Sequence, residues 1–186
     1  MSDAKHPLAP WPTLPPYEQW RETCSALHLW SQIVGKYRLA HTPWVNHSWH
    51  ATLYVTPRGL TTGVIPDHGH SITLDFDFRD HRLVAQADGG GSEGFSLESM
   101  SVADFFAQTK RIIAKVGGSP EIHEHPSEMP DPVPFARDSR VRDYDAAAVE
   151  RFHAALLQVH RVFEHFRTSF LGKVSPVHLF WGCLLY

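Results

Sequence analysis

The sequence predicts an α+β protein in which an antiparallel β-meander packs against a few helices. Apolar residues recur every three or four positions over residues 17–34 and 145–171, which places them on one side of an α-helix. Between these stretches, residues 49–97 alternate apolar and polar side chains and are interrupted by short turns. That alternation indicates strands with one buried and one polar face.

The length of 186 residues suits a single domain. Residues 1–16 contain five prolines and no periodic pattern, so we expect an extended tail. Residues 17–186 are expected to form one α+β domain.

Each helix has a recognisable boundary in the sequence. The first, over residues 17–34, is expected to stop at Gly35, because glycine readily ends a helix. The second is expected to begin after Ser101, and the third, over residues 145–171, has Asp145 as its N-cap. The third helix carries a stripe predicted to form a continuous buried seam: Val149, Phe152, Leu156, Val159, Phe163, Phe166 and Phe170.

The remaining segments are assigned from alternation and turn residues. The expected strands cover residues 49–56, 60–65, 71–78, 82–87, 94–97, 119–123 and 177–186. The long Pro-rich stretch at residues 125–144 is expected to be an ordered loop packed on the core, because it contains Val133 and Phe135.

Two parts of the sequence follow the same order of features. Ile33-Val34-Gly35-Lys36 is followed by a proline and a segment with Trp49, and Phe170-Leu171-Gly172-Lys173 is followed by Pro176 and a segment with Trp181. An internal duplication would explain the repetition. Coincidence is the alternative, because Gly-Lys is a common helix exit.

Several motifs are distinctive when taken together. They occupy residues 27–36, 42–50, 53–62, 75–83, 101–105 and 175–182. Over about residues 11–182 the chain thereby resembles a bacterial family, domain-of-unknown-function family 5996. The resemblance implies no activity. It also implies that members continue into a further aspartate-containing strand, so this chain, ending at Tyr186, is expected to be shorter than typical members and truncated.

Composition argues against some classes of partner. The net charge of −3 gives no broad basic field, so we expect no nucleic-acid partner. No apolar run approaches the ~20 residues that span a bilayer, so we expect no membrane partner. Residues 1–16 lack the apolar core of a signal peptide, and the cysteines show no disulfide framework, so we expect a cytoplasmic protein.

Three histidines are candidates for a metal site. His47 and His50 lie close together in sequence, and His178 has a comparable place in the second of the two similar segments. If they converge, three imidazoles can hold zinc and leave one position open. The alternative is aromatic-rich packing with hydrogen-bonded histidines.

Other candidates lie on the predicted sheet and its flanks. Asp75 and Asp77 share one strand face about 7 Å apart, a geometry that suits acid/base catalysis, with His50 as a further catalytic candidate. Arg38 and Arg58 are candidates for binding an anionic ligand, because arginine matches carboxylate and phosphate groups. Trp49 is a third ligand-binding candidate in this aromatic-rich chain. Solvated acidic pairs and surface salt bridges are the alternatives.

These observations leave the function open among three classes. The first is a small-molecule-binding or interaction domain, with the Pro-rich loop closing over a cleft. The second is a metal- or carboxylate-dependent, hydrolase-like enzyme. The third is a scaffold protein that pairs its sheet with another chain, which includes a homo-oligomer.

Overall fold

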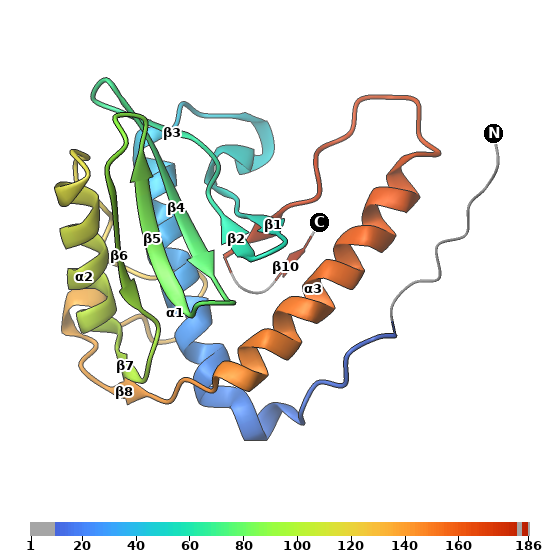
Figure 1. Cartoon of the computed structure of the whole chain (residues 1–186), viewed down its shortest axis with the longest axis horizontal. Coiled ribbons are helices and arrows are strands. Elements are labelled where there is room, and N and C mark those ends of the chain that lie inside the picture. Colours follow the sequence, from blue (N-terminus) through green and yellow to red (C-terminus); the bar gives the residue numbers. More distant parts are fainter. Residues whose placement is uncertain (1–9, 182–183, 186) are drawn as a thin grey trace.

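The computed structural model describes residues 10–181 and 184–185 and confirms the α+β class (Figure 1). Its helices are α1 (Tyr17–His41), η1 (Asn46–Ala51), α2 (Val102–Lys115), η2 (Phe135–Arg137) and α3 (Ala146–Arg167). Its strands are β1 (Tyr54–Thr56), β2 (Gly59–Thr61), β3 (Ile65–Asp67), β4 (His70–Asp77), β5 (Arg82–Ala87), β6 (Ser92–Ser96), β7 (Met100–Ser101), β8 (Val141–Arg142), β9 (Leu179–Phe180) and β10 (Leu184–Leu185).

The main sheet has six antiparallel strands in the order β1-β2-β4-β5-β6, with β3 also paired to β4. The alternation predicted for residues 71–78 and 82–87 is confirmed, and Phe76 lies opposite Leu83 in the register of β4 and β5. The buried face of the sheet carries Ile72, Leu74, Phe76, Leu83, Ala85 and Phe95.

Helices α1 and α2 lie against the buried face of this sheet (Figure 1). The Trp30 ring of α1 stacks on Phe105 of α2 at 4.7 Å between centroids, and Phe105 stacks on Phe76 of β4 at 6.2 Å. Helix α2 begins as predicted, because the Ser101 hydroxyl accepts a hydrogen bond from the amide of Asp104 at 3.0 Å. The core thus joins both helices to the sheet.

The predicted stop of the first helix at Gly35 is wrong, since α1 continues to His41. The indole of Trp181 packs against Gly35, and a Cβ at this position would overlap the ring. The absence of a side chain therefore permits close packing at this point of the helix.

Other strand predictions need correction as well. Trp49 lies in η1, where His47 and Ser48 both have φ of 58°, so only residues 54–56 of the expected strand 49–56 form β1. The expected strand 60–65 is divided between β2 and β3 by residues 62–64, which have no regular structure and in which Gly63 has φ of 66°. Residues 119–123 form no strand.

The two ends of the chain were predicted only in part. Residues 10–16 have no regular structure, and residues 1–9 of the expected tail lie outside the described residues. The expected strand 177–186 contains a pairing of β9 with β10, and residues 182, 183 and 186 also lie outside the described part.

The Pro-rich loop is ordered against the core, as predicted. Phe135 is fully buried, and its ring lies 5.8 Å from that of Phe106. Its amide donates a hydrogen bond to the carbonyl of Glu124 at 2.7 Å. This anchor holds the loop against α2, and Ser127 and Glu128 of the same loop line the cavity described below.

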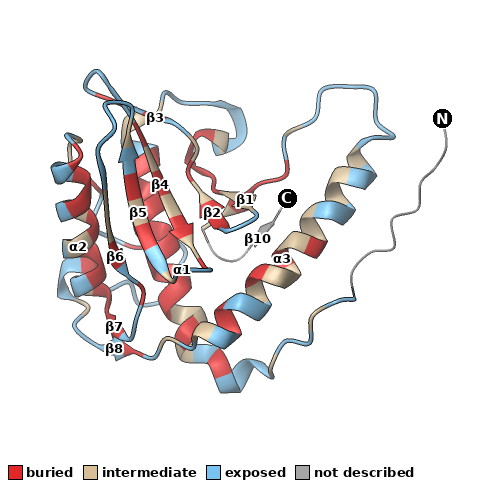
Figure 2. Cartoon of the chain, viewed as in Figure 1, coloured by how far each residue is buried: buried red, intermediate tan, exposed pale blue. Residues whose placement is uncertain are grey.

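Helix α3 has two unlike halves (Figure 2). It begins as predicted, with the Asp145 carboxylate accepting a hydrogen bond from the amide of Ala148, and its first half packs on the core through Val149 and Leu156. Phe166 and Phe170, by contrast, are 78% and 61% exposed. The prediction of a continuous buried seam is therefore wrong. The helix also ends at Arg167, before the expected end at residue 171.

The two similar sequence segments meet in the structure. Leu53 and Leu179 exchange backbone hydrogen bonds of 2.9 and 2.8 Å in the two directions. Helix α1 is buried over most of its length, whereas α3 is half exposed, so the two helices have different surroundings. The duplication stays a prediction.

Candidate functional site

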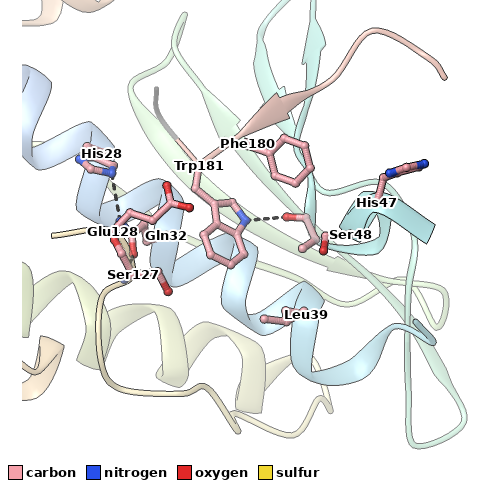
Figure 3. A pocket seen from close by; sticks show the side chains of 10 residues that line it. His28, Gln32, Leu39, His47, Ser48, Ser127, Glu128, Phe180 and Trp181 are labelled. Atoms are coloured by element: carbon pink, nitrogen blue, oxygen red, sulfur yellow. Dashed lines mark hydrogen bonds between the residues drawn. The ribbon is translucent and has the colours of Figure 1, made fainter. Parts of the chain in front are cut away.

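A cavity of about 370 Å³ lies between α1, η1, the Pro-rich loop and β9, and we call it the α1 cavity (Figure 3). It is lined by His28, Gln32, Leu39, His47, Ser48, Ala51, Ser127, Glu128, Phe180 and Trp181. The indole N–H of Trp181 donates a hydrogen bond to the carbonyl of Ala51 at 2.5 Å, which fixes the ring across the cavity.

Three polar residues of α1 lie at intervals of four on the side that faces the Pro-rich loop. They are His28, Gln32 and Lys36, and this spacing places them along one side of the helix. Gln32 is 2% exposed and Lys36 is 4% exposed. Buried polar side chains in a core helix require partners, and the loop supplies them.

Gln32 holds the backbone of Ser127 from two sides. Its amide nitrogen donates to the Ser127 carbonyl at 3.0 Å, and its amide oxygen accepts from the Ser127 N–H at 2.7 Å. The same amide nitrogen lies 3.0 Å from Nε2 of His28, so this ring nitrogen is the acceptor. Burial lowers the pKa of His28, although the nearby charge of Glu128 opposes the shift. The neutral imidazole thus completes a fixed polar wall.

Lys36 lies behind this wall. Its Nζ is 2.8 Å from Oγ of Ser127 and 5.2 Å from the ring centroid of Trp181. Within the described residues, no carboxylate lies within ion-pair distance of this nitrogen. Burial lowers the pKa of Lys36 below its usual range, because an isolated charge is poorly solvated there.

The three histidines considered for a metal site have different surroundings in the structure. His47 lies at the cavity and its ring points away from Trp181 (Figure 3). His50 is buried and its Nδ1 accepts from the amide of Val45 at 3.1 Å, while Nδ1 of His178 lies 2.7 Å from the carbonyl oxygen of Pro176.

The ring centroid of Trp49 lies 5.4 Å from that of His47 and 6.2 Å from that of His178. Among the residues that the structure describes, no three His, Cys, Asp or Glu side chains are grouped so that they could hold a metal ion. Among these residues, His47, His50 and His178 are not grouped as the zinc hypothesis requires.

The predicted carboxylate pair lies elsewhere, on the outer face of the sheet. Arg58, Asp75 and Asp77 line a shallow surface depression there. Arg58 donates to Asp77 at 2.7 Å and to Asp80 at 2.8 Å. Partial burial acts to raise the pKa of Asp77, but the hydrogen bonds from Arg58 and two backbone amides outweigh it, so this pKa is lowered. These pairings favour the salt-bridge alternative for Arg58 and Asp77.

Arg38 is also engaged by the protein itself. It lies within α1, is 8% exposed, and donates to the carbonyl and hydroxyl of Thr52. Its guanidinium lies 5.1 Å from the ring centroid of Tyr54. The side chain thus secures the segment after η1.

The sequence interpretation missed Gln32, Lys36 and Ser127. The spacing of His28, Gln32 and Lys36 by four residues places them on one side of a helix and was a signal for the first two. Ser127 carried no signal, because its role depends on how a loop 91 positions away from Lys36 packs on α1.

The fold and the cavity define an α+β domain in which two residues of the Pro-rich loop, Ser127 and Glu128, form part of the wall of a cavity of small-molecule size. The chain belongs to the family of unknown function DUF5996, whose family model matches residues 11–184. This match confirms the resemblance found in the sequence motifs. Neither the curated proteins nor the solved structures include a match to the chain. Of the helices in the described part of the chain, none has the length and apolar character needed to cross a membrane.

Proposed function

We propose that the protein binds a small molecule with polar and apolar parts in the α1 cavity. The observation that carries this proposal is the clamp of Gln32 on Ser127, with hydrogen bonds of 3.0 and 2.7 Å. A polar wall that is fixed before binding lowers the entropy lost when a ligand is ordered.

The remaining walls of the cavity suit a ligand with both polar and apolar parts. Phe180 and Trp181 supply aromatic surface, and Leu39 supplies aliphatic surface. His28, Ser127 and Glu128 supply hydrogen-bonding groups on the opposite wall (Figure 3). A cavity of about 370 Å³ is near the lower end of the range for ligand sites, which favours a metabolite with few heavy atoms.

A thermal-shift screen tests this proposal. The library contains monocarboxylic acids, their esters and amides, amino acids and nucleosides. We expect at least one compound to raise the melting temperature of the protein, and calorimetry to give one site per chain. Trp181→Leu should abolish the shift, because it removes the aromatic wall.

Trp44→Leu is the matched control, because Trp44 is 73% exposed and lies outside the cavity. It should keep the shift. The proposal fails if no compound binds, or if binding survives Trp181→Leu unchanged.

We also propose the cytoplasm as the compartment. The thiol of Cys24 is free, which suits a reducing environment. Fractionation of cells that express the chain at native level tests this proposal, and recovery in an extracellular fraction would contradict it.

A further inference from the structure

We infer that Ser127 and Lys36 form a nucleophile–base pair that hydrolyses carboxylic esters with a small apolar acyl group. This inference rests on the proposed binding of a small molecule in the α1 cavity. It adds that the bound molecule is an ester, which the pair hydrolyses. The pair differs from the residues that the sequence suggested for hydrolysis, which are His47, His50, His178, Asp75 and Asp77.

The first support is the geometry of the two reacting atoms. Oγ of Ser127 lies 2.8 Å from Nζ of Lys36, within the distance over which a proton passes directly between them. Ser127 lines the cavity, whereas Lys36 does not. The base therefore lies behind the nucleophile, and a substrate meets the hydroxyl first.

The second support is the state of the amine. A lysine acts as a base only when it is neutral, and burial without a counter-charge favours the neutral form. Lys36 is 4% exposed, and within the described chain it makes no ion pair. When the amine is neutral, the Ser127 hydroxyl donates its hydrogen to Nζ, which is the arrangement needed for attack.

The third support is the way Ser127 is held. Gln32, a positioning residue, fixes both backbone polar groups of Ser127, so the hydroxyl has only its side-chain torsion left to set. The next residue, Glu128, has a left-handed backbone with φ of 56°. Its N–H donates to no acceptor among the described residues, so it is available to a developing oxyanion beside the nucleophile.

The reaction balances with water as the second substrate. Oγ of Ser127 bonds to the ester carbonyl carbon while its proton passes to Nζ of Lys36, and the carbonyl π electrons move to oxygen. The tetrahedral intermediate collapses, the bond to the alkoxy oxygen breaks, and the leaving alkoxide takes the proton from Lys36.

Water then completes the cycle. Lys36 takes a proton from water as the water oxygen attacks the acyl carbon. The bond to Oγ breaks, and Ser127 recovers its proton from Lys36. The products are one carboxylic acid and one alcohol. Phe180 and Trp181 line the same cavity and can contact a short apolar acyl group.

Labelling with a fluorophosphonate probe tests the pair. The probe reacts with activated serine hydroxyls, and intact mass spectrometry counts the phosphonyl groups added. We expect one group per chain, located on Ser127 by peptide mapping. Ser127→Ala should abolish the labelling, because alanine has no hydroxyl, and Lys36→Arg should lower the labelling rate about 100-fold or more, the range of general-base catalysis. Arginine keeps a cation at this position but cannot accept a proton.

Ser139→Ala is the matched control, because Ser139 is exposed on the same loop and lies outside the cavity. It should be labelled at the rate of the unaltered protein. Circular dichroism checks that each variant is folded, and if Lys36→Arg is unfolded, Lys36→Met takes its place.

The two proposals fail separately. Ser127→Ala should still bind any hit from the thermal-shift screen, because Gln32 contacts only the backbone of residue 127. Ligand binding without labelling of Ser127 would overturn the nucleophile–base pair and leave the binding proposal intact. Labelling that survives Lys36→Arg at full rate would overturn the role of the lysine.

Discussion

Asp67 shows at the scale of one residue how this chain stabilises a buried charge. Its carboxylate is fully buried and accepts hydrogen bonds of 2.6 Å from the Tyr37 hydroxyl and 2.6 Å from the Ser119 amide. His68 lies 2.9 Å from its second oxygen. Burial acts to raise the pKa of Asp67, but these hydrogen bonds outweigh it, so the pKa is lowered. The carboxylate therefore joins α1, β3 and the segment after α2.

We predict that Asp67→Asn lowers the free energy of unfolding by about 2–3 kcal/mol at pH 7, because hydrogen bonds to a charged acceptor are lost. A lowered folded-state pKa gives stability that is present above the unfolded value of about 3.9 and is lost as pH falls through the folded value. The difference between the unaltered protein and the variant should therefore shrink below about pH 4. Urea unfolding at pH 7 and at acidic pH measures both effects.

Asp131→Asn is the control, because Asp131 is exposed. Its effect on stability should be small at either pH. An equal loss for the two variants at pH 7 would contradict the role assigned to Asp67.

At the scale of one element, α3 stays helical over its whole length although only its first half is packed on the core. Its first half is anchored by Val149 and Leu156, and the Phe152 ring lies 5.6 Å from that of Trp20. Its second half carries Phe166, which is 78% exposed. The same sequence period thus continues past the point where the core ends.

Two substitutions on this helix should differ in their effect on stability. Phe152→Ala should lower the free energy of unfolding by roughly 2–3 kcal/mol, less than a fully buried phenylalanine because the ring is half-buried. Phe166→Ala should change it by less than about 0.5 kcal/mol, as is usual for exposed positions. Urea unfolding of both variants makes the comparison, and equal losses would show that the second half of α3 is covered in solution.

The sequence predicted the features that depend on neighbouring residues and missed those that depend on distant contacts. Local signals predicted the strands β4 and β5, the Ser101 and Asp145 caps and the existence of all three long helices, because these depend on neighbouring residues. The packing of Trp181 against Gly35 within α1 joins residues far apart in sequence, so no local signal indicated it. The cavity has a similar distant contact in its wall, between Gln32 and Ser127, so periodicity did not reveal it.

At the scale of the whole molecule, an apolar groove runs along the exposed half of α3. It is lined by Phe163, Phe166, Arg167, Ser169, Phe170, Val174, Ser175, Pro176 and Val177. Burying such a surface removes apolar area from water, and exposed apolar patches of this kind commonly mark contacts between chains.

We expect this surface to promote self-association of the chain as concentration rises. The double variant Phe166→Ser, Phe170→Ser should shift the monomer–oligomer equilibrium toward monomer, as measured by sedimentation velocity over a range of concentrations. Val141→Ser serves as the control, because Val141 is 60% exposed and belongs to β8. A protein that stays monomeric at every concentration would contradict this expectation.

The hydrogen bond between Trp181 and Ala51 joins residues 130 positions apart. Such contacts form late, because a long stretch of chain must first be brought together. A polypeptide leaving the ribosome can complete its sheet before residue 181 has emerged. Until residue 181 has been made, the amine of Lys36 has no indole beside it, so the surroundings of this buried lysine are complete only after two distant segments of the chain have both been synthesised.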